Sequence, residues 1–255
     1  QKLVAEHIPE IAGVQYYGHA GNTGHALTWG EALGAEIKHL SGYQGHGSLA
    51  HPHGILISWA LMMQGAVQLN NEGRRFSNEM GGYSEQAVKV LNQPDGIAWN
   101  IYDAQRHNFL VNGFPDYCEA VGAGAIHCGA DAAELAKVTC LPELILASTL
   151  AEVQALASGV GSDALGRDFT GVTPLKAPYY AVKVTGALFH TQGGLVIDNT
   201  ARVHRADGGT FMNLYASGGA ACGVSGPAVE GYLSGNGLLT AIAFGYLAGR
   251  NACVV

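Results

Sequence analysis

Glycine is the feature that most restricts what this chain can fold into. It supplies 37 of the 255 residues, about double its average share of roughly 7%. The glycines follow no repeat, which excludes collagen-like and low-complexity chains. Because 48% of the residues are apolar, we expect a globular protein with many tight turns and several places where bare backbone approaches a ligand.

Charge and cysteine usage exclude several classes of protein. The net charge is −7, and the 13 Lys and Arg residues form no basic run, which argues against nucleic-acid or anionic-membrane partners. The longest apolar stretch, near residues 237–249, is shorter than the roughly 20 residues of a membrane span. The five widely spaced cysteines indicate free thiols and no disulfide scaffold. We therefore expect a cytoplasmic protein with no membrane span.

The chain divides into three stretches by local pattern. Residues 1–50 hold a glycine turn at 18–24 and a helical pattern over 26–40. The pattern changes near residue 50 and again near residue 180, so we expect a middle domain, 51–180, inserted between 1–50 and 181–255. The elements expected in the middle domain are a strand-like run over 53–69, a turn at 70–73, a helix over 84–91, a strand over 96–102 and helices over 130–157 broken at Pro142. After it we expect strands at 179–188, 194–197, 202–203 and 213–216, and a buried apolar helix over 237–252.

The last helix follows a glycine-rich segment, residues 232–238. Ser234 or Asn236 is placed to cap the helix, while Gly235 and Gly237 leave backbone N–H groups accessible. A helix N-terminus carries partial positive charge and suits an anion. An ordinary capped helix remains the alternative.

A second glycine segment, residues 218–226, follows the strand expected at 213–216. A strand followed by glycines and a helix lets a large planar ligand contact the backbone. The chain has no G-x-G-x-x-G phosphate-binding turn, since the nearest match, at 122–127, lacks the third glycine.

The segment Arg74–Glu79, with Tyr83 after it, combines two arginines, an aromatic residue and a glutamate. It is either part of a site or a surface hairpin end with a salt bridge. His46, His51 and His53 have neither of the usual zinc spacings, so we expect no metal.

In their order along the chain, these motifs resemble a family of FAD-dependent flavoproteins: the soluble fumarate reductases, tricarballylate dehydrogenases and 3-ketosteroid dehydrogenases. The resemblance spans nearly the whole chain. The matching stretches are residues 21–24, 43–46, 71–79, 187–194, 214–219 and 232–250. In that family about 200 preceding residues hold the Rossmann-like half that grips the FAD pyrophosphate. The resemblance thus implies an α+β chain in which a substrate-capping domain (51–180) is inserted in the C-terminal remnant of an FAD-binding α/β domain (1–50 and 181–255).

The resemblance also implies FAD as cofactor and a set of residues that contact it. It implies a missing N-terminal FAD-binding segment or chain as partner. The implied cofactor-binding residues are Thr23, Gly24, His190, Thr191, Gly218, Gly219, Ser234, Gly235, Asn236 and Leu238.

Departures from the fumarate reductases bear on the substrate. Tyr83 stands where those enzymes have their proton-donating arginine, and Tyr232 where they have a carboxylate-binding arginine. Phe189 replaces a substrate-binding histidine, and Ser58-Trp59 replaces a Thr-Glu pair, so only His46 remains of the polar set. A tyrosine cannot replace the bidentate arginine fork, which argues against a dicarboxylate substrate.

The same two tyrosines resemble the ketosteroid dehydrogenase pattern, although Leu233 replaces its usual proline. That pattern implies that Tyr83 acts as base, while Tyr232 hydrogen-bonds a ketone oxygen; we take His46 as the third catalytic residue. We expect a fragment of an oxidoreductase that moves hydride between flavin N5 and a carbon β to a carbonyl. The expected substrate is a small molecule, an apolar ketone, and we expect the isolated chain to be inactive. The alternatives are a fumarate-reductase-like enzyme for a small carboxylate, using arginines such as Arg75 or Arg106, and a flavin-free ligand-binding domain.

Overall fold

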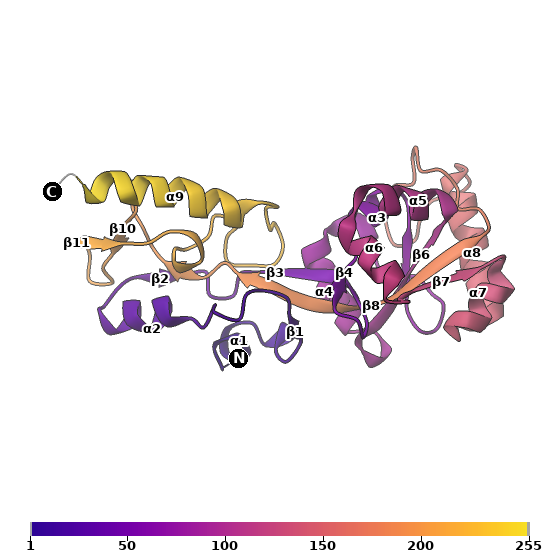
Figure 1. The fold of residues 1–255 in the computed structure, drawn as a ribbon, viewed down its shortest axis with the longest axis horizontal. Coiled ribbons are helices and arrows are strands. Elements are labelled where there is room, and N and C mark those ends of the chain that lie inside the picture. The colour runs from indigo at the N-terminus through magenta and orange to yellow at the C-terminus, as the bar shows by residue number, and fades with distance from the viewer. Residues whose placement is uncertain (1, 254–255) are drawn as a thin grey trace. The chain divides into compact units, whose positions relative to one another are not determined.

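A computed structural model describes residues 2–253, which form two compact units (Figure 1). Unit 1 takes its described residues from Gln1–Gly45 and Leu188–Val255, and unit 2 is His46–Ala187. The functional boundaries predicted near residues 50 and 180 remain a prediction.

Unit 2 contains one sheet and most of the helices. Strands β3 and β8 extend into it from unit 1. Its elements are β3 (Tyr43–Ala50), β4 (Ile55–Leu56), α3 (Ala60–Met63), β5 (Val67–Leu69), α4 (Tyr83–Leu91), β6 (Ile97–Asp103), α5 (Ala104–Gly113), α6 (Pro115–Gly122), β7 (Ile126–Gly129), α7 (Ala132–Thr139), α8 (Glu143–Ala157) and β8 (Tyr179–Thr191), with 3-10 turns at Glu79–Gly81 and Pro94–Gly96.

The sheet of unit 2 is built around the long strand β8. The strand order is β4-β3-β8-β6-β5, and β7 also pairs with β8. Strands β6 and β8 run antiparallel from the pair Ile97↔Thr185 to the pair Asp103↔Tyr179. The β-branched and aromatic residues that alternate along β8 favour this extended conformation.

Apolar side chains cover both faces of this sheet because successive residues of a strand point to opposite sides. On β6, Ala98 and Tyr102 join one core cluster, with α3, α4, α5 and α6. Trp99 and Ile101 join the other, with α7 and α8. Unit 2 is therefore a sheet with helices on both faces.

Two of these helices begin at aspartates that cap them. Asp103 accepts a hydrogen bond from the backbone N–H of Arg106 (3.2 Å) at the start of α5. Asp131 accepts one from the N–H of Glu134 (2.9 Å) at the start of α7. Such caps satisfy N–H groups that the first turn of a helix leaves unpaired.

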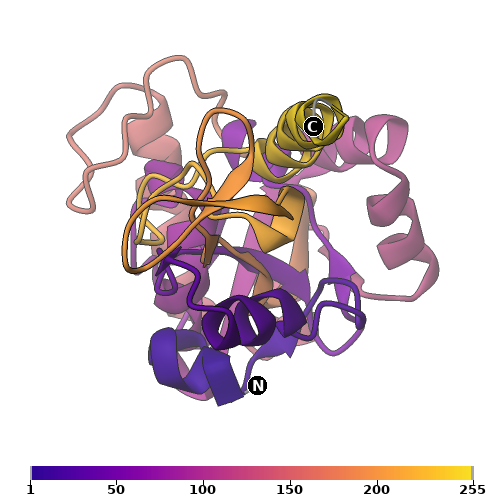
Figure 2. The same cartoon turned by 90° about the vertical axis from the view of Figure 1, so that its left-hand side faces the viewer.

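Unit 1 is a smaller assembly of short strands between helices (Figure 2). Its core contains Leu195, Val203, Ala216 and Ala221, with Phe244 packed against it. Its elements are α1 (Lys2–His7), β1 (Gln15–Tyr16), α2 (His25–Ala32), β2 (Ile37–Lys38), β9 (Gly194–Leu195), β10 (Arg202–His204), β11 (Thr210–Tyr215) and α9 (Asn236–Ala252), with 3-10 turns at Pro9–Ile11 and Gly218–Ala220.

The expectation that the last helix is buried is wrong for the part of the chain that the structure describes. Helix α9 forms as predicted, but it buries only Asn236 and Thr240. Leu238, Ile242 and Tyr246 are 73%, 71% and 67% exposed. They are four residues apart and so form one apolar stripe, which no described element covers.

Two further expectations are corrected. The helix predicted over 26–40 ends at Ala32 because Gly34 adopts a left-handed backbone (φ 76°) and Ile37 begins a strand. The run over 53–69 is not one strand, since Ala60–Met63 is a helix that ends before Gly65 (φ 98°). Alanine, leucine and methionine are good helix formers, and here this preference prevails over the apolar run.

The turn and the helices predicted for unit 2 agree with the structure. The Asn70–Gly73 turn closes through a hydrogen bond from the N–H of Gly73 to the carbonyl of Asn70 (2.9 Å). Helix α4 and the helix pair broken at Pro142 form where predicted. No helix within residues 2–253 is long and apolar enough to cross a membrane.

Candidate functional site

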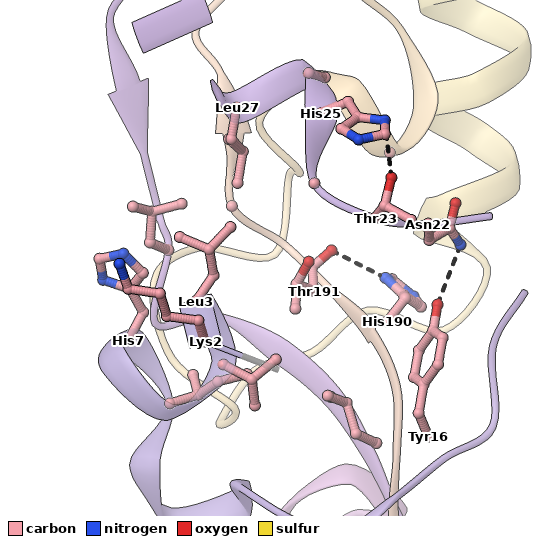
Figure 3. A pocket seen from close by; sticks show the side chains of 18 of the residues that line it. Lys2, Leu3, His7, Tyr16, Asn22, Thr23, His25, Leu27, His190 and Thr191 are labelled. Carbon is pink, nitrogen blue, oxygen red and sulfur yellow. Dashed lines mark hydrogen bonds between the residues drawn. The ribbon is translucent and has the colours of Figure 1, made fainter. Parts of the chain in front are cut away.

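A cavity of about 920 Å³ lies in unit 1 (Figure 3). Its walls come from α1, the turn after it, the loop before α2, α2 itself, the end of β8 and the glycines near α9. Its lining residues include Lys2, Leu3, Thr23, Gly24, Trp29, His190, Thr191, Gly219 and Gly237. It is large enough for a ligand of cofactor size.

The predicted cofactor residues Thr23 and Gly24 form the rim of this cavity at the start of α2. Gly24 has a left-handed backbone (φ 80°), and a Cβ there would lie 3.1 Å from Leu3 Cδ1. A side chain at this position would therefore be strained as well as crowded. The Thr23 hydroxyl lies 3.0 Å from Nδ1 of His25.

The other predicted cofactor residues divide into three groups. His190, Thr191 and Gly219 line the large cavity. Gly218 and Asn236 line a cavity of about 30 Å³ that also contains His190. The remaining three, Ser234, Gly235 and Leu238, line neither cavity.

The start of α9 differs from the predicted cap. Its N-cap is Gly235, with a left-handed backbone (φ 81°). The N-cap position is therefore neither of the two predicted residues, Ser234 and Asn236. The Asn236 amide instead donates to Ser225 Oγ (2.7 Å) and to the Leu233 carbonyl (3.0 Å), so it fixes the preceding loop.

Tyr232 lies beside His190 at this end of unit 1. Its hydroxyl donates to Gln44 Oε1 (3.0 Å) and lies 3.1 Å from His190 Nε2. The amide of Gln192 lies 3.3 Å from His190 Nδ1. Burial lowers the pKa of His190, and the opposing effect of the Thr191 carbonyl is smaller. His190 is therefore mainly neutral at pH 7.

His46 and Tyr83 lie together in unit 2. Their ring centroids are 5.1 Å apart, and the Trp59 ring meets His46 edge-on at 5.7 Å. Nδ1 of His46 accepts a hydrogen bond from the backbone N–H of Ser48 (3.2 Å). Burial lowers the pKa of His46 to about 3, so this imidazole is neutral across the physiological pH range.

The Arg74–Glu79 segment had two interpretations, part of a site or a surface hairpin end with a salt bridge. The second is wrong. Arg75 forms ion pairs with Glu79 and with Asp163, each at 2.8 Å. Arg167 also contacts Glu79 (3.1 Å), and the Glu79 side chain is fully buried. Phe169 lies under both guanidinium groups, 5.1 and 4.7 Å from them. The segment is part of a buried ion cluster.

This cluster favours the charged forms of Arg75 and Asp163. Burial alone would lower the pKa of Arg75, but Glu79 and Asp163 outweigh it and raise that pKa. Burial alone would raise the pKa of Asp163, but Arg75 and the backbone N–H of Arg167 outweigh it and lower that pKa. The guanidinium group of Arg75 is thus paired with two internal carboxylates.

Arg106 is likewise bound within unit 2. It donates to the Asp103 carboxylate (2.9 Å) and to the carbonyls of Gln64 (2.8 Å) and Thr173 (2.6 Å). Its side chain is 3% exposed. Arg75 and Arg106 are the two arginines considered for a carboxylate substrate. Both donate their hydrogen bonds to buried groups of unit 2.

A metal site has no set of ligands in the described part of the chain. Within residues 2–253, no three His, Cys, Asp or Glu side chains lie close enough to hold an ion.

Sequence reasoning missed most of the cavity wall. Helix α1 and the 3-10 turn after it supply Lys2, Leu3 and Ile8, but a six-residue helix gives too little periodicity to be recognised. Gln44, which accepts the hydrogen bond of Tyr232, lies in the matching stretch 43–46, but the motif gave it no predicted role. Asp163 and Arg167 carried no local signal, because they are 88 residues from Arg75 and Glu79.

Comparison with known proteins identifies the family. The sequence profile of a family described as FAD binding domain matches residues 1–238. The chain belongs to this family of flavoproteins, which confirms the resemblance drawn from the motifs. FAD is its cofactor.

Relatives and solved structures agree with this assignment. The chain is 29% identical over 254 residues to the probable fumarate reductase Ifc3 of Shewanella frigidimarina, covering 99% of the chain and 42% of the relative. A flavocytochrome c3 fumarate reductase in its open conformation matches 99% of the chain and 44% of its own, with 29% identity and a TM-score of 0.76. The 3-ketosteroid-delta4-(5alpha)-dehydrogenase of Rhodococcus jostii RHA1 has a TM-score of 0.67 at 22% identity, over 98% of the chain and 50% of its own, which shows a common fold.

The chain spans about two fifths of the length of the curated relatives it matches. The cavity in unit 1 fits part of an FAD molecule. Gly24, Gly219 and Gly237 present bare backbone, Leu3 and Trp29 present apolar surface, and these suit a planar ring. The glycine turn that would bind the pyrophosphate is not in this sequence.

Proposed function

We propose that this chain is the substrate-capping and flavin-facing part of an FAD-dependent oxidoreductase that acts next to a carbonyl group, as 3-ketosteroid dehydrogenases do. In this proposal unit 2 is the capping domain, inserted in the part of the FAD-binding domain that unit 1 represents. Tyr83, Tyr232 and His46 are its catalytic residues. The isolated chain is inactive because it lacks the pyrophosphate-binding turn.

The choice of substrate rests on one observation: the arginines considered for a carboxylate substrate are already bound by groups within the chain. Arg75 and Arg106 are held by buried carboxylates and carbonyls. The Tyr232 hydroxyl donates to the neutral amide of Gln44 and lies 3.1 Å from the neutral imidazole of His190. Neutral donors suit a carbonyl oxygen, whereas a carboxylate needs a cation.

The residues support a two-part reaction. A hydrogen bond from Tyr232 polarises the C=O group and stabilises the enolate that forms when the adjacent C–H loses its proton. Tyr83, in its phenolate form, takes that proton and becomes the neutral phenol, and the neutral His46 ring packs against it. The β-carbon loses hydride, and the C=C bond forms between the two carbons. Bound FAD supplies the two-electron acceptor for that hydride.

The cavity residues of unit 1 would hold the cofactor. Thr23 and Gly24 at the rim, His190 and Thr191 on β8, and Gly219 before α9 line the space. The implied contacts of Gly218, Ser234, Gly235, Asn236 and Leu238 remain part of the proposal. The exposed position of Leu238 fits a contact with a segment outside this chain.

We also propose that the missing FAD-binding segment of the parent protein covers the apolar stripe of α9. Leu238, Ile242 and Tyr246 form this stripe, and Trp29 on α2 is 66% exposed on the same unit. Exposed apolar patches of this kind indicate an interface. When the two segments are expressed as separate chains, Ile242→Glu should weaken their association at least tenfold. The control is Leu144→Glu, at a leucine of unit 2 that is 84% exposed, and an equal effect of both substitutions would contradict the proposal.

Reduction of a small unsaturated carboxylate is the second candidate. It is favoured by the names of the relatives, which are fumarate reductases at 28–29% identity. The two candidates differ in direction as well as in substrate, since one oxidises a saturated ketone and the other reduces an alkene acid.

A half-reaction experiment on the intact, FAD-loaded parent separates the two. Oxidised enzyme is mixed without oxygen with cyclohexanone-type ketones, and reduced enzyme is mixed with fumarate. We expect ketones to bleach the oxidised-flavin absorption band, and fumarate to leave the reduced flavin unchanged. Rapid reoxidation by fumarate, with no bleaching by any ketone, would contradict the proposal.

A further inference from the structure

The surroundings of the Tyr232 hydroxyl define a chain of hydrogen bonds within unit 1. Tyr232 Oη–H donates to Gln44 Oε1 at 3.0 Å, and a side-chain carbonyl oxygen can only accept. The single hydroxyl proton is therefore directed at Gln44. His190 Nε2, 3.1 Å away, must then carry the proton of their hydrogen bond and donate it to the tyrosine oxygen.

This assignment fixes the rest of the chain. A neutral imidazole with its proton on Nε2 has an accepting Nδ1. Gln192 Nε2 lies 3.3 Å from that nitrogen and can donate to it. The Thr191 carbonyl, 3.2 Å from Nδ1, would favour a proton on that nitrogen. The direction of the Tyr232 hydroxyl opposes this, because it leaves Nε2 as the donor, and burial keeps the ring neutral. The order of donation is thus Gln192 to His190, His190 to Tyr232, and Tyr232 to Gln44.

Such a chain has two consequences for Tyr232. A donor on the phenol oxygen polarises the O–H bond, which strengthens the hydrogen bond that the hydroxyl itself donates. The hydroxyl also has one proton, so a ligand oxygen can receive it only by displacing Gln44. Gln44 is half-buried, so its oxygen can turn to water once displaced.

We propose that Gln44 and His190 are positioning residues for Tyr232: His190 holds the hydroxyl as a donor, and Gln44 is the acceptor that a neutral ligand carbonyl displaces. The inference rests on the proposed function for the identity of the ligand, but the hydrogen-bond chain itself does not. In this arrangement Gln44 competes with the ligand for the Tyr232 proton. Removing Gln44 should therefore strengthen ligand binding, whereas removing a residue that only supports the site would weaken it.

The first measurement tests the chain of hydrogen bonds in the free 255-residue protein by NMR. With ¹⁵N-labelled histidine, the His190 ring should show its proton on Nε2, and Tyr232→Phe should shift both ring nitrogens. With ¹³Cζ-labelled tyrosine, Gln44→Leu should shift the Tyr232 resonance, while Gln44→Glu, which keeps an acceptor, should largely restore it. Gln105→Leu, an exposed glutamine of α5, is the control. No response of His190 to Tyr232→Phe, or of Tyr232 to Gln44→Leu, would overturn the inference.

The second measurement tests the competition with cyclohex-2-enone as a neutral carbonyl probe and cyclohexene as its counterpart without oxygen. The enone, but not cyclohexene, should shift the Tyr232 resonance. Its affinity should rise about two- to tenfold in Gln44→Leu, because one net hydrogen bond of about 0.5–1.5 kcal/mol no longer competes, and should fall in Gln44→Glu. Weaker or unchanged binding in Gln44→Leu would overturn the role of Gln44. An intact hydrogen-bond chain with no enone response in any variant would instead contradict the proposed ketone substrate, and with it the ligand part of the inference.

Discussion

The buried imidazole of His46 should make the stability of this protein depend on pH in a way that one substitution removes. His46 is buried beside Trp59 and Tyr83, and its pKa falls from 6.5 to about 3. Between pH 6.5 and about pH 3, His46 is therefore protonated in the unfolded chain but neutral in the folded chain. By linkage, the contribution of His46 to stability is present above about pH 6.5 and is lost as the pH falls toward 3.

The size of this pH effect follows from the number of protons that His46 binds in the folded and unfolded chains. At about pH 5 the unfolded imidazole is almost fully protonated and the folded one is neutral. The free energy of unfolding should thus drop by about 2 kcal/mol between about pH 7 and about pH 5, at a limiting slope of about 1.4 kcal/mol per pH unit. This value depends little on the folded pKa as long as that pKa lies well below 5.

The assay is urea unfolding of wild type and His46→Asn at both pH values. The Asn side chain offers an oxygen near the position of Nδ1, so the hydrogen bond from Ser48 can be kept. Only the pH-dependent difference is read, which cancels the constant cost of the substitution. His53→Asn, at an exposed histidine, serves as control. If wild type and His46→Asn lose the same free energy of unfolding on acidification, the assignment of a neutral, buried His46 is refuted.

Three other outcomes are expected. The isolated chain should bind FAD more weakly than micromolar in calorimetry, because no glycine turn is present to bind the pyrophosphate; micromolar or tighter binding would contradict this. Glu79→Gln should lower the free energy of unfolding by about 3–5 kcal/mol, because Arg75 and Arg167 lose their buried carboxylate partner. Glu152→Gln, on the exposed side of α8, is the control and should change this free energy little. Equal losses in the two variants would contradict a stabilising role of the cluster. Tyr232→Phe in the intact parent should slow ketone oxidation about 10²–10³-fold through loss of the donor to the enolate; unchanged turnover would remove Tyr232 from the mechanism.

Local signals in the sequence predicted much of unit 2. Helix α4, the helices on either side of Pro142 and the strand β8 each lie in a stretch whose spacing or breaker residue marks it. The helix over 26–40 was predicted too long because apolar spacing does not show which backbone conformation Gly34 adopts. Its left-handed backbone instead ends the helix.

The residues proposed for the site come from the family motifs. His46 with Tyr83, and His190 with Tyr232, lie next to each other within their units. The buried ion cluster was not predicted, since its two halves are 88 residues apart in the sequence and no periodicity links them. The burial of α9 was predicted wrongly because an apolar helix indicates that a covering surface exists, but not that the same chain supplies it.

The measurement that tests the central claim most directly is the reductive half-reaction of the intact parent carrying Tyr83→Phe. The hydroxyl is the only group removed, so FAD binding and the oxidised-flavin spectrum should be retained; this spectrum is the necessary control. The rate at which a ketone bleaches the flavin should fall about 10²–10⁴-fold, as expected when a positioned base is lost. If the variant with its flavin spectrum intact bleaches at the wild-type rate on every ketone that the parent oxidises, Tyr83 is structural and the account of oxidation next to a carbonyl is contradicted.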